Sequence, residues 1–117
     1  DMIEMLFATG IPFGEKQGLS DTLHQLEKLM SKCAGVRRQG AAALDLAYVA
    51  AGRLDGYWET SLQAWDIAAG LIIAKEAGAL IEGFKNSQES PIRSGSLICA
   101  NNMIFDNFRS FRFWVLI

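Results

Sequence analysis

The feature that most constrains the fold is the regular alternation of short apolar runs with longer segments of helical periodicity. Apolar side chains recur at helical spacing over residues 19–33, 41–51 and 65–77, and we expect a last helix after Asn101 or Asn102. Short strand-like runs occupy residues 5–9, 36–38, 54–59, 79–84 and 96–100. Because strands alternate with helices, the sequence predicts an α/β fold built in layers.

Glycines mark the ends of two predicted helices. Gly52 follows the second helix and Gly78 follows the third, where a left-handed residue commonly ends a helix. The polar stretch 85–93 joins the last two strand-like runs, which favours an antiparallel hairpin. The helix over residues 41–51 is apolar on nearly all sides, so we expect it to be buried.

Composition and charge exclude several classes of protein. The chain has 117 residues, of which 50% are hydrophobic and 21% charged, a globular balance that fits one domain. A net charge of −2 gives no sign of a nucleic-acid surface. Asp45 and Asp66 interrupt the longest apolar stretches, which fall short of the roughly 20 residues of a membrane span. No signal peptide is evident, so we expect a cytoplasmic protein with Cys33 and Cys99 as buried thiols.

The two ends of the chain look unusual for a complete domain. The sequence enters a strand-like segment almost at once, and residues 105–117 carry five aromatic side chains. A soluble protein rarely leaves such an aromatic segment uncovered. We interpret the start as a truncation. We expect residues 109–117 to be either a non-native tail or a segment that docks on a missing partner.

Two carboxylates and a glycine are the candidate site residues. Asp66 falls in the first turn of a helix, where the helix dipole favours its ionised form and thus a role as a Mg²⁺ ligand. Glu59 ends a strand, and ligands bind at the carboxyl ends of strands in α/β sheets. Gly40 opens a helix, where backbone N–H groups can meet an anionic ligand. Taken singly, each has a plainer explanation: a helix cap, a solvated side chain and a turn. Trp65 is expected to fix the angle at which the third helix begins.

Four stretches in the right order carry more information than any single residue. They are RRQGAAALDLAYVAAGRLDGYWE at residues 37–59, WDIAAG at 65–70, AGA at 77–79 and ANN at 100–102. Together they closely resemble the second half of the inositol monophosphatase family, over roughly residues 3–108. The WDIAAG run followed by a Gly-Ala pair after the helix is specific to that family.

The resemblance implies the C-terminal portion of a layered α-β-α-β-α sugar-phosphatase fold, with a central mixed sheet flanked by helices. It implies Mg²⁺-dependent hydrolysis of a phosphate monoester such as myo-inositol 1-phosphate. By the family's pattern, Asp66 is a metal ligand and Glu59 accepts hydrogen bonds from substrate hydroxyls. The residues expected to line or flank the substrate pocket are Gly40, Ala41, Ala42 and Arg37.

The sequence departs from the family's pattern in two ways. Ala41 stands where the family usually has Ser or Thr, which removes a hydroxyl contact and puts the preferred sugar in doubt. The Glu-Glu metal site and the Asp-Pro-Asp-Gly loop of the family's first half are both missing; neither Pro12 nor Pro91 follows an Asp. We therefore expect residues 1–117 to be a C-terminal domain without its N-terminal metal-binding half, and to be inactive alone.

Two alternatives remain open at this point. One is a sister enzyme of the same fold that acts on fructose 1,6-bisphosphate or a 3′-phosphonucleotide. The other is a non-catalytic module that binds a partner through the helix at 19–30 or through the aromatic tail. For the intact protein we expect a homodimer that binds a sugar or inositol phosphate and contacts neither nucleic acid nor membrane.

Overall fold

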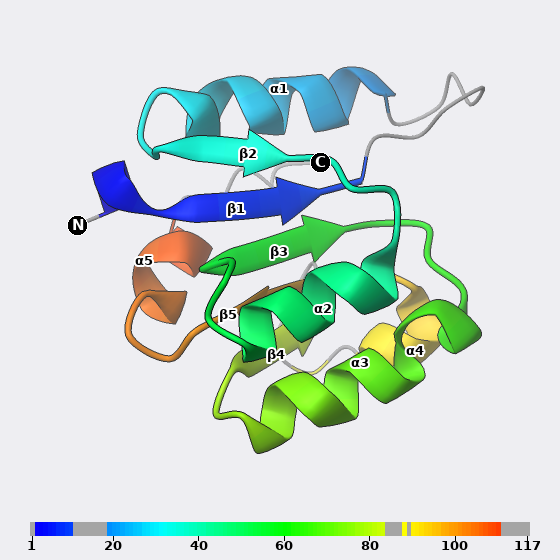
Figure 1. Ribbon diagram of the computed structural model, residues 1–117. Helices are drawn as coiled ribbons and strands as arrows, with labels where there is room; N and C mark the ends of the chain where they lie inside the picture. The colour runs from blue at the N-terminus through cyan, green and yellow to red at the C-terminus, as the bar shows by residue number, and fades with distance from the viewer. Residues whose placement is uncertain (1, 11–18, 84–87, 89, 111–117) are drawn as a thin grey trace.

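A computed structural model describes residues 2–10, 19–83, 88 and 90–110. It shows one sheet with helices on both sides (Figure 1). The strands are β1 (Leu6–Thr9), β2 (Gly35–Arg37), β3 (Gly56–Glu59), β4 (Leu80–Gly83) and β5 (Leu97–Ala100). The helices are the 3₁₀ turn η1 (Met2–Glu4), α1 (Leu19–Met30), α2 (Ala42–Ala50), α3 (Ala64–Glu76), α4 (Pro91–Ser94) and α5 (Phe105–Ser110).

The sheet has the strand order β2-β1-β3-β5-β4. β1 pairs in parallel with both β2 and β3, whereas β5 pairs antiparallel with both β3 and β4. The expected mixed sheet is thus confirmed, and so is the antiparallel pairing of the last two strands. β3 is the strand at which the sheet changes from parallel to antiparallel pairing.

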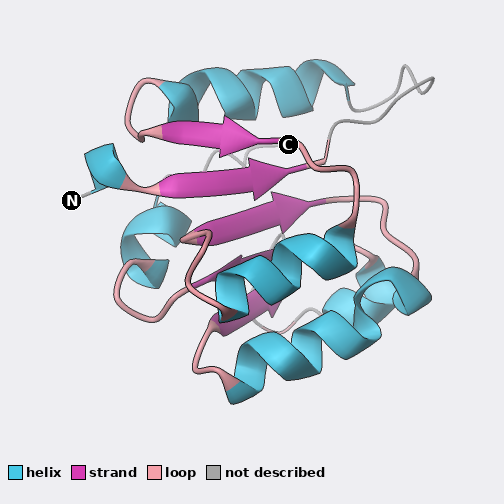
Figure 2. Cartoon of the chain, in the orientation of Figure 1, coloured by secondary structure: helices cyan, strands magenta, loops and turns pink. Residues whose placement is uncertain are grey.

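The alternation of side chains along each strand divides the core into two halves. Phe7 and Trp58 face α1 and α5, where the Phe7 ring stacks on the Phe108 ring with 4.6 Å between centroids. Ala8 and Tyr57, their neighbours in sequence, face the opposite side and pack against α2 and α3. Figure 2 shows the helices in two groups, one on each side of the sheet.

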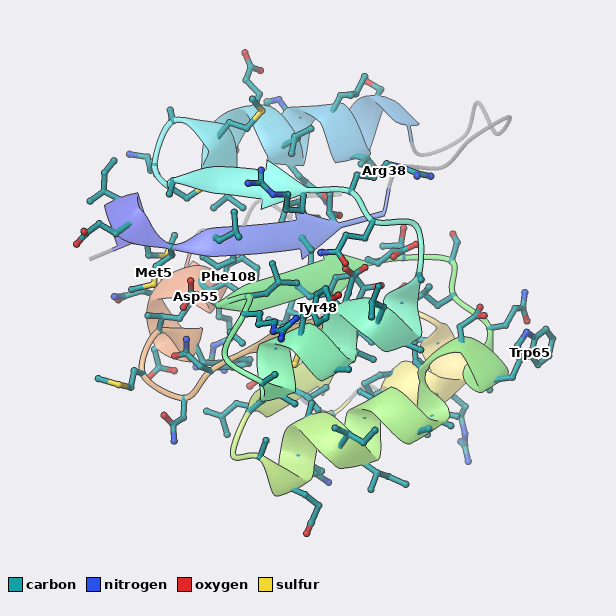
Figure 3. All side chains as sticks on the ribbon, in the orientation of Figure 1. Met5, Arg38, Tyr48, Asp55, Trp65 and Phe108 are labelled. Carbon is teal, nitrogen blue, oxygen red and sulfur yellow. The ribbon has the colours of Figure 1, made fainter. Side chains whose placement is uncertain are left out.

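Three sequence-based expectations about helices were wrong. α2 is only half covered, since Leu44 is 41% exposed while Asp45 on the same helix is 1% exposed. Trp65 is 80% exposed and projects away from the domain (Figure 3), so it cannot fix the start of α3. Pro91–Ser94 form the short helix α4 within a stretch expected to be loop, with Pro91 in the first turn, where its missing N–H has no intrahelical partner to lose.

Other expectations concern the cysteines, the tail and membrane spans. Cys33 and Cys99 are free and buried, as expected. Within the aromatic segment, Phe105 and Phe108 are buried in the core, and residues 111–117 lie outside the described residues. None of the helices in the described ranges is long and apolar enough to cross a membrane.

Candidate functional site

The candidate site lies at the carboxyl ends of β1 and β3. The register pairs Thr9 with Trp58, which places Gly10 beside Glu59 just beyond the strands. Thr9 fixes this end of the sheet, because its Oγ1 donates a 2.8 Å hydrogen bond to the carbonyl oxygen of Trp58. The approach of Gly10 and Glu59 is so close that a Cβ on Gly10 would stand 2.1 Å from Glu59 Cδ. The Glu59 carboxyl group therefore lies directly against the backbone that follows β1.

Tyr57 holds the Glu59 carboxylate from the other side. The two residues share a face of β3 because side chains two apart in a strand point the same way. The Tyr57 hydroxyl donates a hydrogen bond to Glu59 Oε1, and the Tyr57 side chain is fully buried. Burial, followed by the negative charge of Glu59, raises the pKa of Tyr57, so this hydroxyl stays protonated and remains a donor. The carboxylate is thus anchored by one oxygen.

Glu59 sits in a balance of opposing charges. Burial raises its pKa above the ordinary value, the Tyr57 hydrogen bond and the Arg38 guanidinium lower it, and the Asp66 carboxylate raises it. The net shift is upward. These interactions show that Arg38 and Asp66 both lie within electrostatic reach of Glu59. A partly desolvated carboxylate of this kind is an acceptor suited to substrate hydroxyl groups.

Asp66 is the third residue of α3. Its Oδ2 accepts a 3.0 Å hydrogen bond from the backbone N–H of Gln63, which satisfies one of the free donors at the start of the helix. The plainer explanation of Asp66 as a helix cap is therefore correct. It does not exclude a ligand role, because a carboxylate that accepts one hydrogen bond has further lone pairs.

The loop between β3 and α3 fixes the relation of Glu59 to Asp66. Ser61 has a φ of 62°, a left-handed conformation that is uncommon for a residue with a side chain. The Leu62 N–H donates a 2.8 Å bond to the Gly95 carbonyl. Gly95 itself has a φ of 74°, and a Cβ there would lie 2.3 Å from the Leu62 carbonyl oxygen. The loop is thus held against the end of α4, at a site that accepts only glycine.

Asp45 is a third carboxyl group near Glu59. It is 1% exposed on α2, and its Oδ1 has no hydrogen-bond partner within the described part of the chain. Burial, and to a lesser degree the charge of Glu59, raises its pKa to about 7. A buried carboxyl group without a partner is unfavourable for stability.

The remaining sequence-based candidates lie between β2 and α2. Gly40 has a φ of 81°, which lets the chain turn from the end of β2 toward the helix. Ala41 is the extended N-cap residue of α2 and has no side-chain cap, and Ala42 is buried. Arg37 is exposed at the end of β2. Of these two neighbouring arginines, it is Arg38 whose charge lowers the pKa of Glu59.

Sequence reasoning did not single out four residues that the structure places at or near Glu59. They are Gly10, Arg38, Asp45 and Tyr57. A period-two signal was available for Tyr57, which stands two residues before Glu59 on a strand. Asp45 is the one carboxylate inside an apolar helix, a pattern that often marks a functional or strained group. Gly10 and Arg38 carried no such signal, because their proximity to Glu59 depends on strand pairing and on the turn after β2.

Comparison with known proteins decides the family. The sequence profile of the inositol monophosphatase family matches residues 3–110. This chain belongs to the inositol monophosphatase family. The inositol-1-monophosphatase of Caulobacter vibrioides is 44% identical over 98 residues, which are 84% of this chain and 38% of that protein. The Nus factor SuhB of Pseudomonas aeruginosa is 44% identical over 102 residues, 86% of this chain and 37% of that protein.

Solved structures give the same result for the fold. The extragenic suppressor protein suhB of Bartonella henselae superimposes with a TM-score of 0.85 and 38% identity, covering 97% of this chain and 42% of that one. The mixed sheet with helices on both faces is therefore the fold of inositol monophosphatase family members. The chain spans well under half the length of the relatives it matches.

The described residues contain no complete metal site of their own. No group of three or more His, Cys, Asp or Glu side chains that could hold a metal ion occurs among them. Mg²⁺ requires near-octahedral oxygen coordination, commonly with one or two carboxylates and several waters. Asp66 fits as one such carboxylate. The chain can thus supply part of a magnesium site and needs further ligands to complete it.

Proposed function

We propose that this chain is the C-terminal domain of a Mg²⁺-dependent phosphatase that hydrolyses an inositol phosphate or a related sugar phosphate monoester. The observation that carries the proposal is the pair of carboxylates at the end of the sheet. Glu59, held by Tyr57, and Asp66, at the start of α3, lie within electrostatic reach of each other. Family membership supports the reaction class, and this pair supplies the chemistry.

Each carboxylate has a separate role in this proposal. Glu59 accepts hydrogen bonds from hydroxyl groups on the sugar ring and so orients the substrate. Asp66 contributes one anionic ligand to the metal. Mg²⁺, when bound, supplies charge stabilisation for the phosphoryl oxygens and activates water for in-line attack. The other metal ligands would come from the larger part of the family fold that this chain does not span.

The curated relatives carry two kinds of name at equal identity, 44% for an inositol-1-monophosphatase and 44% for a Nus factor. Overall identity therefore does not choose between them. The retention of the Glu59 and Asp66 carboxylates in one site favours phosphate hydrolysis. It also argues against a purely non-catalytic module, because burial of a carboxylate, which raises its pKa, is unfavourable unless the group has a role.

A hybrid protein tests the proposal. Residues 3–110 would replace the matching segment of the Caulobacter vibrioides inositol-1-monophosphatase, to which this chain is 44% identical. We expect the hybrid to release phosphate from myo-inositol 1-phosphate in the presence of Mg²⁺, and the isolated 117-residue chain to release none. Calorimetry should show that the isolated chain binds Mg²⁺ only weakly.

The matched variants are Asp66→Asn and Asp106→Asn in the hybrid. Asp66→Asn should lower kcat/KM by at least about a hundredfold, because an amide is a far poorer magnesium ligand than a carboxylate. Asp106 lies on α5 with its side chain 89% exposed, so its substitution should leave activity unchanged. Phosphate release by the isolated chain, or full activity of Asp66→Asn, would contradict the mechanism. Faster hydrolysis of fructose 1,6-bisphosphate or a 3′-phosphonucleotide would replace the proposed substrate with one of those.

A further inference from the structure

The space that a side chain on Gly10 would fill is occupied by the carboxyl group of another residue. A Cβ built on Gly10 would lie 2.1 Å from Glu59 Cδ, 2.1 Å from Oε2 and 2.4 Å from Oε1. These three nearest atoms are the whole carboxyl group of Glu59. Since real Cβ contacts of this kind are not found below about 3 Å, any larger residue at position 10 must displace that group.

The need for glycine at this position is steric rather than conformational. The described glycines with positive φ are Gly40, Gly52, Gly78 and Gly95, and Gly10 is not one of them. The backbone at position 10 is therefore open to any L-residue. What excludes a side chain is the Glu59 carboxyl group, which is the mobile end of a flexible side chain and can move when pushed.

The other close glycines have a different cause. A Cβ on Gly56 would meet the Phe7 ring at 2.8 Å, and one on Gly70 would meet Leu46 at 2.7 Å, so both positions serve the packing of the core. Of the glycines whose surroundings are described, Gly10 is the one whose closest neighbour is a carboxylate. Its small size thus serves the candidate site.

The backbone at Gly10, against which the Glu59 carboxyl group lies, is also fixed in place. Thr9 ties the end of β1 to β3 through its bond to the Trp58 carbonyl. The buried Tyr57 hydroxyl holds Glu59 Oε1. The carboxyl group is therefore held by the Tyr57 hydroxyl while it lies against Gly10.

We propose that Gly10 is a positioning residue of the substrate site, which lets the Glu59 carboxyl group rest against the end of β1 and so determines which substrate hydroxyls it can reach. The inference rests on the proposed function, in which Glu59 binds the hydroxyls of a sugar phosphate. It adds a specificity-determining role for a residue with no side chain. A methyl group at position 10 would displace the carboxylate from this position and disturb its hydrogen bond with Tyr57.

The test is Gly10→Ala in the hybrid protein, assayed with myo-inositol 1-phosphate. We expect kcat/KM to fall roughly ten- to a hundredfold, the range for a lost hydrogen bond to a charged group. The loss should appear mainly as a higher KM, because the affected contact orients substrate in the ground and transition states alike. Gly35→Ala is the control: Gly35 also lacks a positive φ, its nearest contact is Leu6 at 3.3 Å, and it lies on β2 where that strand pairs with the opposite end of β1.

A double-mutant cycle separates positioning from general damage. Glu59→Ala removes the atoms that a methyl group at position 10 would meet, so adding Gly10→Ala to Glu59→Ala should lower kcat/KM by less than about twofold more. Thermal unfolding of the four proteins, measured in parallel, should show that Gly10→Ala folds. If Gly10→Ala fails to fold alone yet folds with Glu59→Ala, that rescue demonstrates the same steric contact.

The outcomes distinguish this inference from the function on which it rests. An unmodified hybrid without phosphatase activity would overturn the proposed function. An active hybrid that is insensitive to Glu59→Ala would overturn the role of Glu59. An active, Glu59-dependent hybrid in which Gly10→Ala has no effect, or in which the two substitutions reduce activity independently, would overturn the positioning role of Gly10 alone.

Discussion

Asp55 and Glu59 flank the same strand, and the two carboxylates are treated in opposite ways. Asp55, before β3, accepts hydrogen bonds from the Leu6 backbone N–H at 2.9 Å and the Asn101 amide at 3.2 Å. Its backbone N–H and carbonyl also pair with Leu6 and Asn101. Glu59, at the end of β3, accepts a hydrogen bond from Tyr57 and lies near two further carboxyl groups. The charge of Asp66 raises the pKa of Glu59, and the charge of Glu59 raises the pKa of Asp45. In Figure 3, Asp55 and Arg38, which acts on Glu59, lie at opposite ends of the sheet.

The difference is one of hydrogen-bonding balance at the two ends of β3. Asp55 accepts hydrogen bonds from two separate parts of the fold, the start of β1 and the end of β5, and links them to the start of β3. The Glu59 end has an excess of acceptors over donors, including the unpartnered Oδ1 of Asp45. Such an excess destabilises a protein by itself and is expected where a ligand supplies the missing donors or positive charge.

The largest effect should come from Asp45, which tests whether the Glu59 end is strained. Its pKa in the folded protein is about 7, against 3.8 for an ordinary Asp, so the folded state holds the proton more tightly. Stability should therefore fall as pH rises from about 4 to about 7. Asp45→Asn cannot titrate, and it should stabilise the chain by up to about 4 kcal/mol at pH 8 and by little at pH 4.

Urea unfolding at pH 4, 6 and 8 measures this difference. Asp106→Asn, at an exposed position, should follow the wild-type profile. A gain at pH 4 equal to that at pH 8 would mean that the gain does not come from titration of Asp45. A loss at pH 8 would mean that Asp45 is ionised and partnered, and that the two ends of β3 are alike.

The next largest effect should come from removing each of the two carboxylates, Asp55 and Glu59, in turn. Asp55→Ala leaves the Leu6 N–H and the Asn101 amide without their acceptor, and should destabilise the chain by about 2–3 kcal/mol. In the hybrid protein the activity per folded molecule should stay within about threefold of wild type. Glu59→Ala should do the reverse, with unfolding within about 1 kcal/mol of wild type and a large loss of kcat/KM. Equal stability losses for the two variants would remove the distinction.

A smaller effect should follow from removing the side chain of Asn101, which bonds both to Asp55 and to the turn that leads into α5. Asn101 Oδ1 accepts hydrogen bonds from the N–H groups of Met103 and Ile104 at 3.0 and 3.1 Å and so caps the last helix. Asn101→Ala should destabilise the chain by about 1 kcal/mol. Because Asn101 also bonds to Asp55, the double variant should lose less than the sum of the two single losses. Strict additivity in chemical denaturation would show that Asp55 and α5 act separately.

The sequence predicted the fold better than the site, and particular residues show why. Apolar spacing and the glycines after each helix are local signals, and they located all five strands to within two residues of their bounds in the described chain. Glu59 was singled out as a site candidate from its place at a strand end, but the contacts of the two carboxylates were not predictable. The partners of Asp55 lie 46 and 49 positions away, and Gly10 lies 49 positions before Glu59, so only strand pairing brings these residues together.

The errors have the same origin. Helix α2 was expected to be buried because of its composition, but exposure depends on what packs against it, and Leu44 has little cover while Asp45 has much. Trp65 was expected to fix the angle at which α3 begins, but its side chain is 80% exposed, and little of the described chain packs over it. Gly10 carried no local signal, because what excludes a side chain there is the carboxyl group of a residue 49 positions later in the sequence.

The smallest effect should be that of Trp65, which belongs to neither the Asp55 end nor the Glu59 end of β3. Its side chain is 80% exposed, and substitutions at such positions usually change stability by less than about 0.5 kcal/mol. Trp65→Ser in the isolated chain should therefore leave the unfolding midpoint unchanged. Leu46→Ala is the matched control, because Leu46 is fully buried on α2 and should lose about 2–5 kcal/mol. A large loss for Trp65→Ser would restore its expected role at the start of α3.

The pairing of β1 with β3 also has a consequence for synthesis of the chain. The hydrogen bond from the Leu6 N–H to Asp55 spans 49 residues, and the bond from Asn101 to Asp55 spans 46. At a ribosomal rate of about 5–20 residues per second, β1 must wait roughly 2–10 s for β3, and β3 waits about as long again for β5. During that interval Phe7 and Ala8, fully buried in the finished domain, lack one of their two partner strands, because only β2 has been synthesised. Aggregation on the ribosome should therefore depend on the translation rate between residues 10 and 56 more than on the stability of the folded domain.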